Sequence, residues 1–332
     1  VSSRRQRQMC IRDRNIVMPN IEEQNLTEFL LEVKAKMVNI TISQNHDINE
    51  INDYVLSNTG KFVRSKIIYH YGNEIGVKHN KLLELSAAAE LIHLSTLIHD
   101  DIIDEADIRR NKPTVVKKWG LKKAVLYGDF LYTKTFQALN SLDNTDIADE
   151  LIRCAEKLIE GEFNQLKIHK EGIVSESEYY DVIEKKTAVL FSGILKCLGI
   201  EMSFNNEDQS HLQSLGLAFG KAFQINDDLS DFLDSDKTGK AKFKDLNEGK
   251  LTLPAIFLFN SVDEIEKAQI NKLIESGDYY AVNKLIESKN GFENARKARD
   301  EAIDDCIEYT ERFIKLDKLE SLKIFLRETL VA

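Results

Sequence analysis

Proline, cysteine and long apolar runs are scarce in this chain of 332 residues, and each scarcity excludes a class of structure. The three prolines, Pro19, Pro113 and Pro254, leave room for long helices, because proline breaks a helix interior. The four cysteines have no C-x-x-C spacing, which argues against a disulfide framework or a zinc site and fits a reducing cytoplasm. No apolar run approaches the roughly 20 residues of a membrane span. We therefore expect a soluble, cytoplasmic protein without a transmembrane segment.

Basic charge is also in deficit. The formal net charge of −10 argues against broad nucleic-acid binding through a basic face. The chain lacks G-x-G-x-x-G, P-loop and G-x-S-x-G patterns, so a nucleotide-cofactor enzyme or a serine hydrolase has no support. Residues 1–17 are rich in arginine and have no apolar period, and we expect them to be a disordered or cloning-derived tail.

Apolar residues recur with a helical period along most of the remaining chain. The segments with this period are 21–38, 82–104, 122–142, 146–168, 176–199, 207–232 and 252–259. Residues 262–330 alternate charged and apolar residues at the same spacing, and no segment alternates as a strand does over eight residues. The sequence therefore predicts an all-α fold, with a single helix-bundle domain over residues 18–332.

The acidic pattern D-D-x-x-D occurs twice, at residues 100–104 and again at residues 227–231. Residues i and i+4 share a helix face, so the first and last acids of each copy project together. Clustered carboxylates need a cation, and Mg²⁺ suits them because it keeps room for substrate phosphates. A single copy could as easily be a solvated helix end, but two copies that each follow an apolar run favour a metal site. The predicted ligands are Asp100, Asp101, Asp104, Asp227, Asp228 and Asp231.

Basic residues lie beside both acidic motifs, as a phosphate substrate would require. Each one alone is more easily explained as a solvated surface charge, whereas their joint placement favours a phosphate site. Arg109 and Arg110 follow the first motif, Lys240 and Lys250 follow the second, and the further candidates Lys61, Arg64 and Lys186 lie elsewhere in the sequence.

Two small residues, Ser95 and Thr96, lie about one helical turn before Asp100. Small side chains at this position would leave an apolar channel open beneath the metals, where an aromatic ring would plug it. Ordinary close packing of helices explains the small residues equally well.

From residue 60 to residue 254, the order and spacing of these motifs resemble the trans-type polyprenyl diphosphate synthases. The matching motifs are Gly60-Lys61-x-x-Arg64, Glu90-Leu91-Ile92-His93, His99-Asp100-Asp101-x-x-Asp104, Arg109-Arg110, Gly128-Asp129-x-Leu131, Gly161-Glu162, Lys186-Thr187, Phe223-Gln224-Ile225-x-Asp227-Asp228-x-x-Asp231 and Asp245-Leu246-x-x-Gly249-Lys250-x-Thr252-Leu253-Pro254.

The resemblance implies the isoprenoid synthase fold, a helix bundle around a central apolar cavity. It also implies head-to-tail condensation of isopentenyl diphosphate with an allylic diphosphate, by ionisation, condensation and elimination. Three Mg²⁺ ions per active site and a homodimer are expected, with no more than transient membrane contact during product release.

The resemblance further assigns roles to individual residues. Asp100, Asp104 and Asp227 would be direct metal ligands, assisted by Asp101, Asp228 and Asp231. The allylic diphosphate would be held by Arg109, Lys186, Lys240 and Lys250. Isopentenyl diphosphate would be held by Lys61, Arg64, His93 and Arg110. Thr187 and Gln224 would face the developing cation.

This sequence departs from the family pattern at three positions. Phe62 stands where many members have a basic residue, and Ala241 and Phe243 replace a commoner proline and glycine.

Ser95 and Thr96 resemble the corresponding residues of medium- and long-chain members, which predicts a hexaprenyl to octaprenyl product.

Four alternatives remain beside the main hypothesis. A shorter-chain farnesyl or geranylgeranyl diphosphate synthase would keep every motif. A terpene cyclase or a head-to-head synthase would not need the isopentenyl diphosphate site of Lys61, Arg64 and His93. A non-catalytic subunit of a heteromeric synthase would usually lose acidic ligands, and both motifs are whole. A helical scaffold with incidental acids would show no Mg²⁺-dependent turnover.

Overall fold

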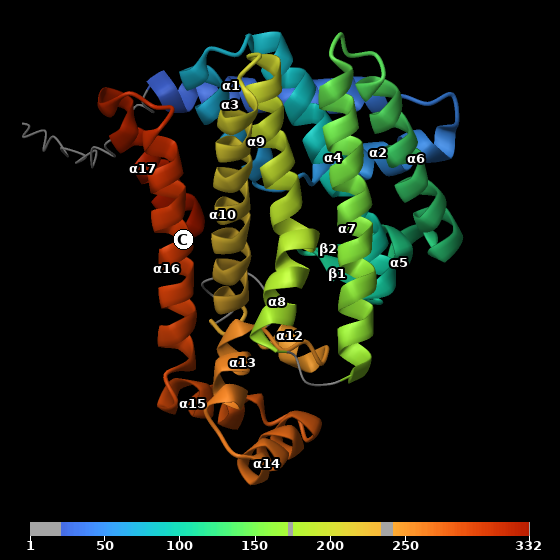
Figure 1. The fold of residues 1–332 in the computed structure, drawn as a ribbon. Helices are drawn as coiled ribbons and strands as arrows, with labels where there is room; N and C mark the ends of the chain where they lie inside the picture. The colour runs from blue at the N-terminus through green and yellow to red at the C-terminus, as the bar shows by residue number, and fades with distance from the viewer. Residues whose placement is uncertain (1–20, 172–174, 234–241, 332) are drawn as a thin grey trace, which may run out of the picture.

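The computed structural model describes residues 21–171, 175–233 and 242–331. This part of the chain is almost entirely helical (Figure 1), which confirms the predicted all-α fold. None of its helices combines the length and apolar character that crossing a membrane requires. The predicted tail, residues 1–17, lies outside the described residues, as do Lys240 and Ala241.

The first acidic motif ends the fourth helix of the chain. The elements up to that point are α1 (Ile21–Thr41), α2 (His46–Ser57), α3 (Val63–Ile75) and α4 (His79–Ile103). A small hairpin of β1 (Ile108–Arg109) and β2 (Lys112–Pro113) follows, then α5 (Val115–Trp119), α6 (Leu121–Leu139) and α7 (Thr145–Glu171).

The second acidic motif ends another long helix. It is preceded by α8 (Glu176–Ile183), the π-helical turn η1 (Glu184–Ala188) and α9 (Val189–Glu201), and it closes α10 (Asn206–Ser230). The remaining helices are α12 (Lys244–Asn247), α13 (Leu253–Asn260), α14 (Glu264–Glu275), α15 (Tyr279–Ser288), α16 (Gly291–Glu311) and α17 (Leu316–Leu330).

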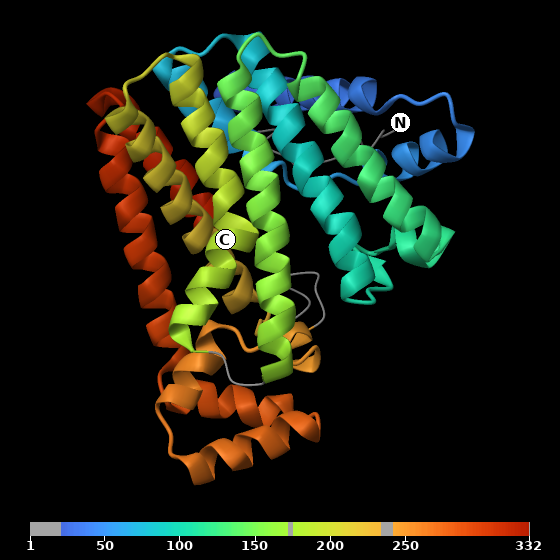
Figure 2. The same ribbon diagram turned by 45° about the vertical axis from the view of Figure 1, so that its right-hand side comes forward.

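The long helices run side by side and form the walls of a bundle. Helix α10 packs between α9 and α16, α7 packs on α9, and α4 packs on α6 and α1. In Figures 1 and 2, α1 lies across one end of the bundle, whereas α14 and α15 lie at the opposite end. The two acidic motifs therefore sit at the ends of two bundle helices, part-way down the molecule.

Small residues allow α10, the helix that ends in the second motif, to approach α9 closely. Gly216 of α10 lies against α9, where an added Cβ would collide with the carbonyl oxygen of Phe191. Alanines 87–89 of α4 are almost completely buried in the core. Such close backbone approach leaves little freedom for the helix ends, because packed interiors resist displacement.

Two local features were not predicted from the sequence. The segment 176–199 is not one regular helix, because the π-helical turn η1 interrupts it. The hairpin at residues 108–113 has strands of only two residues each, too short to produce an alternating pattern.

Candidate active site

A cavity of about 2340 Å³ opens where α4 and α10 end. It brings together most of the residues that the sequence singled out. Those that line it are Lys61, Arg64, His93, Thr96, Asp100, Asp104, Arg109, Arg110, Lys186, Thr187, Gln224, Asp227, Asp228 and Lys250. Three others, Ser95, Asp101 and Asp231, are buried beside the cavity without lining it.

The three acids of the first motif have different surroundings. Burial raises the pKa of Asp100 to about 6, against the opposing charge of Lys186. Asp104 accepts a hydrogen bond from Lys250 Nζ at 2.9 Å. Burial would raise the pKa of Asp104, but the contact with Lys250 outweighs it and the pKa falls below its ordinary value. Asp100 and Asp104 thus face the cavity beside matching cations.

Asp101 instead positions an arginine. It is 3% exposed and accepts a hydrogen bond from Arg109 Nε at 2.7 Å. Residues i and i+1 are about 100° apart around a helix, so Asp101 cannot share the face of Asp100. Its assisting role, as expected from the resemblance, would act through Arg109.

The hairpin explains why the side chains of the neighbouring residues Arg109 and Arg110 have different partners. Its two-residue loop, Arg110 and Asn111, has φ values of 51° and 60°, the left-handed geometry of a tight hairpin turn. Arg110 Nη1 donates to the carbonyl oxygen of Asn58 at 3.0 Å. A Cβ at Gly60 would collide with the Arg110 guanidinium, so glycine is required for this approach. The two arginines therefore serve different parts of the cavity.

A buried cationic pocket lies at the start of α3. Arg64 is 8% exposed, with its guanidinium carbon 4.8 Å from the centroid of the Phe191 ring. Its Nε has no hydrogen-bond partner, and burial lowers its pKa to about 10. Burial also lowers the pKa of His93 well below its ordinary value, so the imidazole is neutral. An unsatisfied buried donor beside a cavity suits an anion.

Asp228 of the second motif is the centre of a hydrogen-bond network. Its two oxygens accept from Tyr179 Oη at 2.6 Å and from Gln224 Nε2 at 2.8 Å. Gln224 Oε1 in turn accepts from Thr187 Oγ1 at 2.7 Å. The network joins α8, η1 and α10, and it orients the two residues that were expected to face the cation. Tyr179 was not predicted, since no pattern connects it with residue 228.

Asp231 has both carboxylate oxygens directed at backbone groups. They accept the N–H groups of Lys244 at 3.1 Å and Asp245 at 3.2 Å. Asp227 is the exposed acid of the second motif and lines the cavity. Asp245 also lines it, and burial together with the charge of Asp231 raises the pKa of Asp245 to about 7.

The π-helical turn carries Lys186 and Thr187. A π-helical turn is a rare local widening that is frequent at functional sites. Lys186 Nζ contacts the carboxylate of Glu162 and the side-chain oxygen of Gln165, both on α7. Lys186 is therefore held at the cavity wall between two helices.

The two expected chain-length residues point in different directions. Thr96 lines the cavity, and its hydroxyl donates to the carbonyl oxygen of His93 at 2.8 Å. Ser95 is fully buried, and its hydroxyl donates to the carbonyl oxygen of Gly128 on α6 at 2.8 Å. Ser95 therefore packs between α4 and α6, whereas Thr96 lines the cavity.

The donor set of the cavity fits Mg²⁺. Its carboxylates are hard oxygen ligands, and the charge of Asp104 adds to burial in raising the pKa of Asp100, as it would where a cation is needed. When bound, Mg²⁺ would be held by Asp100 and Asp104 on one side and Asp227 on the other. These three acids are not among the described residues whose ligand atoms all lie within 4.8 Å of one another, and Mg²⁺ between them would take further ligands from phosphate oxygens.

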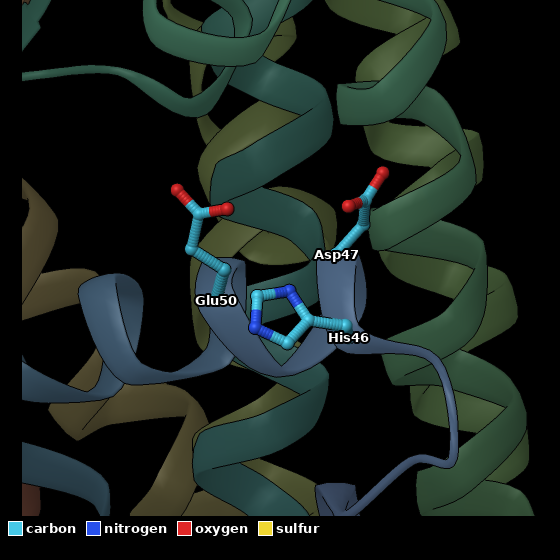
Figure 3. Close-up of side chains that lie close together, drawn as sticks. All are labelled: His46, Asp47 and Glu50. Atoms are coloured by element: carbon cyan, nitrogen blue, oxygen red, sulfur yellow. The ribbon is translucent and has the colours of Figure 1, made fainter.

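Among the described residues, one set of three ligand-type side chains lies within 4.8 Å: His46, Asp47 and Glu50 (Figure 3). All three are exposed in the first turn of α2 and lie outside the cavity. Asp47 is paired with Lys123 at 2.7 Å. A solvated helix start, with an acid near its N-terminus, explains this cluster.

Comparison with known proteins decides the family. The family model described as Polyprenyl synthetase matches residues 45–288 of the chain. This chain belongs to the polyprenyl synthetase family. It is a polyprenyl diphosphate synthase, an enzyme that transfers prenyl groups, as the resemblance predicted.

Individual relatives of this polyprenyl synthetase agree in length and fold. The octaprenyl diphosphate synthase of Escherichia coli K12 is 34% identical over 265 residues, covering 78% of this chain and 82% of that protein. The geranylgeranyl diphosphate synthase of Methanosarcina mazei is 32% identical over 226 residues, covering 66% and 70%. The crystal structure of the decaprenyl diphosphate synthase of Rhodobacter capsulatus superimposes with a TM-score of 0.85 and 29% identity, covering 92% and 97%. The isoprenoid synthase fold is thereby confirmed.

Proposed function

We propose that this polyprenyl diphosphate synthase condenses isopentenyl diphosphate with an allylic diphosphate in a Mg²⁺-dependent, head-to-tail reaction. The observation that carries the proposal is one cavity with two separate cationic regions and two acidic motifs. Lys186 and Lys250 lie beside the acids, whereas Arg64 lies at the start of α3 and Arg110 lies in the hairpin turn. Two diphosphates can therefore bind in one site without sharing their cations.

The residues of the cavity support ionisation of the allylic substrate. Bound Mg²⁺ would neutralise charge on the leaving diphosphate. Arg109, Lys186 and Lys250 would bind its oxygens, and Arg64, Arg110 and Lys61 would orient isopentenyl diphosphate for attack. The neutral His93 would contribute a hydrogen bond without charge. Thr187 and Gln224 present oxygen atoms near the wall of the cavity, where they would stabilise an adjacent carbocation.

One incubation tests this function. The purified protein is mixed with isopentenyl and farnesyl diphosphates, with Mg²⁺ or with EDTA, and the products are separated by chromatography after removal of the diphosphate. We expect Mg²⁺-dependent elongation, with no product in EDTA. Absence of any elongation with every allylic primer from dimethylallyl to geranylgeranyl diphosphate would refute the proposal.

We further propose a medium- or long-chain product, hexaprenyl to octaprenyl, made in the cytoplasm. The small side chain of Thr96 in the channel supports this product length, as do relatives named as octaprenyl and decaprenyl diphosphate synthases. A relative named as a geranylgeranyl diphosphate synthase keeps the shorter product as the alternative. The product length from the same incubation decides between them.

Thr96→Phe would shorten the product, because an aromatic ring would block the channel one turn from Asp100. Ser95→Phe is the informative comparison. Ser95 packs against Gly128, so we expect that variant to lose stability rather than to act as a simple plug. Unchanged product length in Thr96→Phe would contradict the open-channel explanation.

We also propose a homodimer. Helix α7 carries a stripe of exposed apolar side chains at helical spacing: Ile152, Ile159, Phe163 and Leu166. An exposed apolar stripe of this length is typical of a protein interface. Ile159, Phe163 and Leu166 also line the cavity, so a partner covering α7 would complete its wall.

A further inference from the structure

The short helix α12 places at the cavity a lysine that none of the sequence motifs includes. Lys244 is the first residue of α12, and it lines the cavity together with Asp227, Asp245 and Lys250. Lys244 Nζ forms an ion pair with the carboxylate of Glu248 at 3.3 Å, and the Lys244 side chain is 45% exposed. The ammonium group is therefore free to change partner without leaving a buried pair.

Asp231 fixes the backbone that carries this lysine. Its carboxylate accepts the N–H groups of Lys244 and Asp245, and its carbonyl oxygen accepts the N–H group of Phe243 at 2.9 Å. Asp231 is 6% exposed and does not line the cavity. This is the hydrogen bonding of an acid that caps a turn, with each carboxylate oxygen accepting one backbone N–H group.

Phe243 holds the same turn from its other side. Its φ of 60° lies in the left-handed region, which is unfavourable for a bulky residue. Its ring is 3% exposed, with centroids 6.1 Å from Phe232 and 5.2 Å from Tyr280. Packing therefore holds the strained backbone in place, and the start of α12 is fixed both by hydrogen bonds and by aromatic contacts.

We propose, building on the function proposed above, that Lys244 binds the diphosphate of the allylic substrate and that Asp231 is its positioning residue, not a metal ligand. On binding, the ammonium exchanges the carboxylate of Glu248 for a phosphate oxygen. Charge-assisted contacts of this kind are stronger than neutral hydrogen bonds. Lys244 would then face the diphosphate opposite to the first acidic motif.

Binding of inorganic pyrophosphate in saturating Mg²⁺, measured by calorimetry, tests the role of Lys244. We expect Lys244→Met to weaken binding by roughly tenfold, and Lys244→Arg to retain affinity within about threefold. Lys242→Met is the matched control, because the Lys242 ammonium lies over the rings of Phe243 and Tyr280, outside the cavity lining. Equal affinity of Lys244→Met and the wild type would overturn the proposal.

A double-mutant cycle tests the role of Asp231. If Asp231 acts through Lys244, Asp231→Asn weakens pyrophosphate binding about as much as Lys244→Met, and the double variant is no weaker. The Mg²⁺ concentration for half-maximal binding then stays at the wild-type value. Additive losses or a raised Mg²⁺ requirement would make Asp231 a metal ligand and overturn its positioning role.

The two proposals fail in different ways. If wild-type protein binds pyrophosphate but never elongates a prenyl chain, the proposed function is refuted. If the wild type elongates chains and Lys244→Met binds pyrophosphate normally, only the assignment of Lys244 is refuted.

Discussion

Asp228 is a buried acid whose two oxygens are satisfied from two different helices. Asp228 is 4% exposed, and burial raises its pKa well above the ordinary value. Tyr179 on α8 and Gln224 on α10 supply its donors. Because buried polar groups without partners are costly, each donor contributes to folding as well as to the orientation of the site.

Tyr179→Phe should lower the free energy of unfolding by about 2 kcal/mol, because it leaves one oxygen of Asp228 buried without a donor. Urea denaturation followed by circular dichroism measures the change. Tyr180→Phe is the control, since this neighbour has a half-buried ring and no such acid to satisfy; we expect less than about 0.5 kcal/mol. Equal effects of the two substitutions would contradict the role of Tyr179.

Two acids at the cavity make the folded state sensitive to pH. Burial raises the pKa of Asp100 to about 6 and that of Asp245 to about 7, from an ordinary value of 3.8. An acid with a raised pKa stabilises the fold below its unfolded pKa, and this contribution is lost as pH rises through the folded value. Without Mg²⁺, we therefore expect the contribution of these two acids to the free energy of unfolding to fall between about pH 4 and pH 7, by on the order of 3 kcal/mol for Asp100 and 4 kcal/mol for Asp245.

Denaturation in EDTA at a series of pH values measures this dependence. Asp245→Asn should flatten the upper part of the profile, since the amide does not ionise. Mg²⁺ with pyrophosphate should also flatten it, because a bound cation favours ionised carboxylates. If the profile of Asp245→Asn in EDTA had the same slope as that of the wild type between pH 5 and pH 7, Asp245 would not carry the effect.

At the scale of elements, the π-helical turn η1 decides where Lys186 and Thr187 point. Helix α10 packs so closely on η1 that a Cβ at Gly220 would collide with the backbone of Ala188. One turn earlier on α10, Gly216 makes a similar contact with α9, away from the cavity. These two glycines give a matched pair for separating stability from function.

Gly220→Ala should displace η1 and weaken Mg²⁺-pyrophosphate binding by roughly tenfold, together with a loss of about 1–3 kcal/mol in unfolding free energy. Gly216→Ala should cost a similar free energy of unfolding and leave pyrophosphate binding within about twofold. Calorimetry and urea denaturation on both variants measure the two effects. If Gly216→Ala weakened binding as much, the contact between Gly220 and η1 would have no special role.

The sequence predicted the helices and the two acidic motifs because both depend on local spacing. Asp100 and Asp104 face the cavity as helical geometry requires. It did not predict the contacts of Tyr179 with Asp228 or of Asp231 with Lys244, because these join separate elements through tertiary packing. The different surroundings of Ser95 and Thr96 could not be predicted for a similar reason: neighbours on a helix point about 100° apart, and the position of α6 decides which of them packs against Gly128.

At the scale of the whole molecule, α7 has two tasks. The same face of α7 holds Lys186 through Glu162 and carries the exposed apolar residues Ile159, Phe163 and Leu166. Phe163 is 70% exposed and Ile159 is 50% exposed, although both also line the cavity. A second copy of the chain over this stripe would remove apolar surface from water and close the cavity wall.

Light scattering with size-exclusion chromatography should therefore give about twice the 38.0 kDa of one chain at micromolar concentration. The double variant Ile159→Glu/Phe163→Glu should run as a monomer, because charges at the centre of an apolar interface are costly to bury. Ile265→Glu is the control: Ile265 is 72% exposed on α14, at the far end of the bundle, and should leave the dimer intact. A wild-type monomer at all concentrations, or a variant dimer as stable as the wild type, would place the interface elsewhere or exclude it.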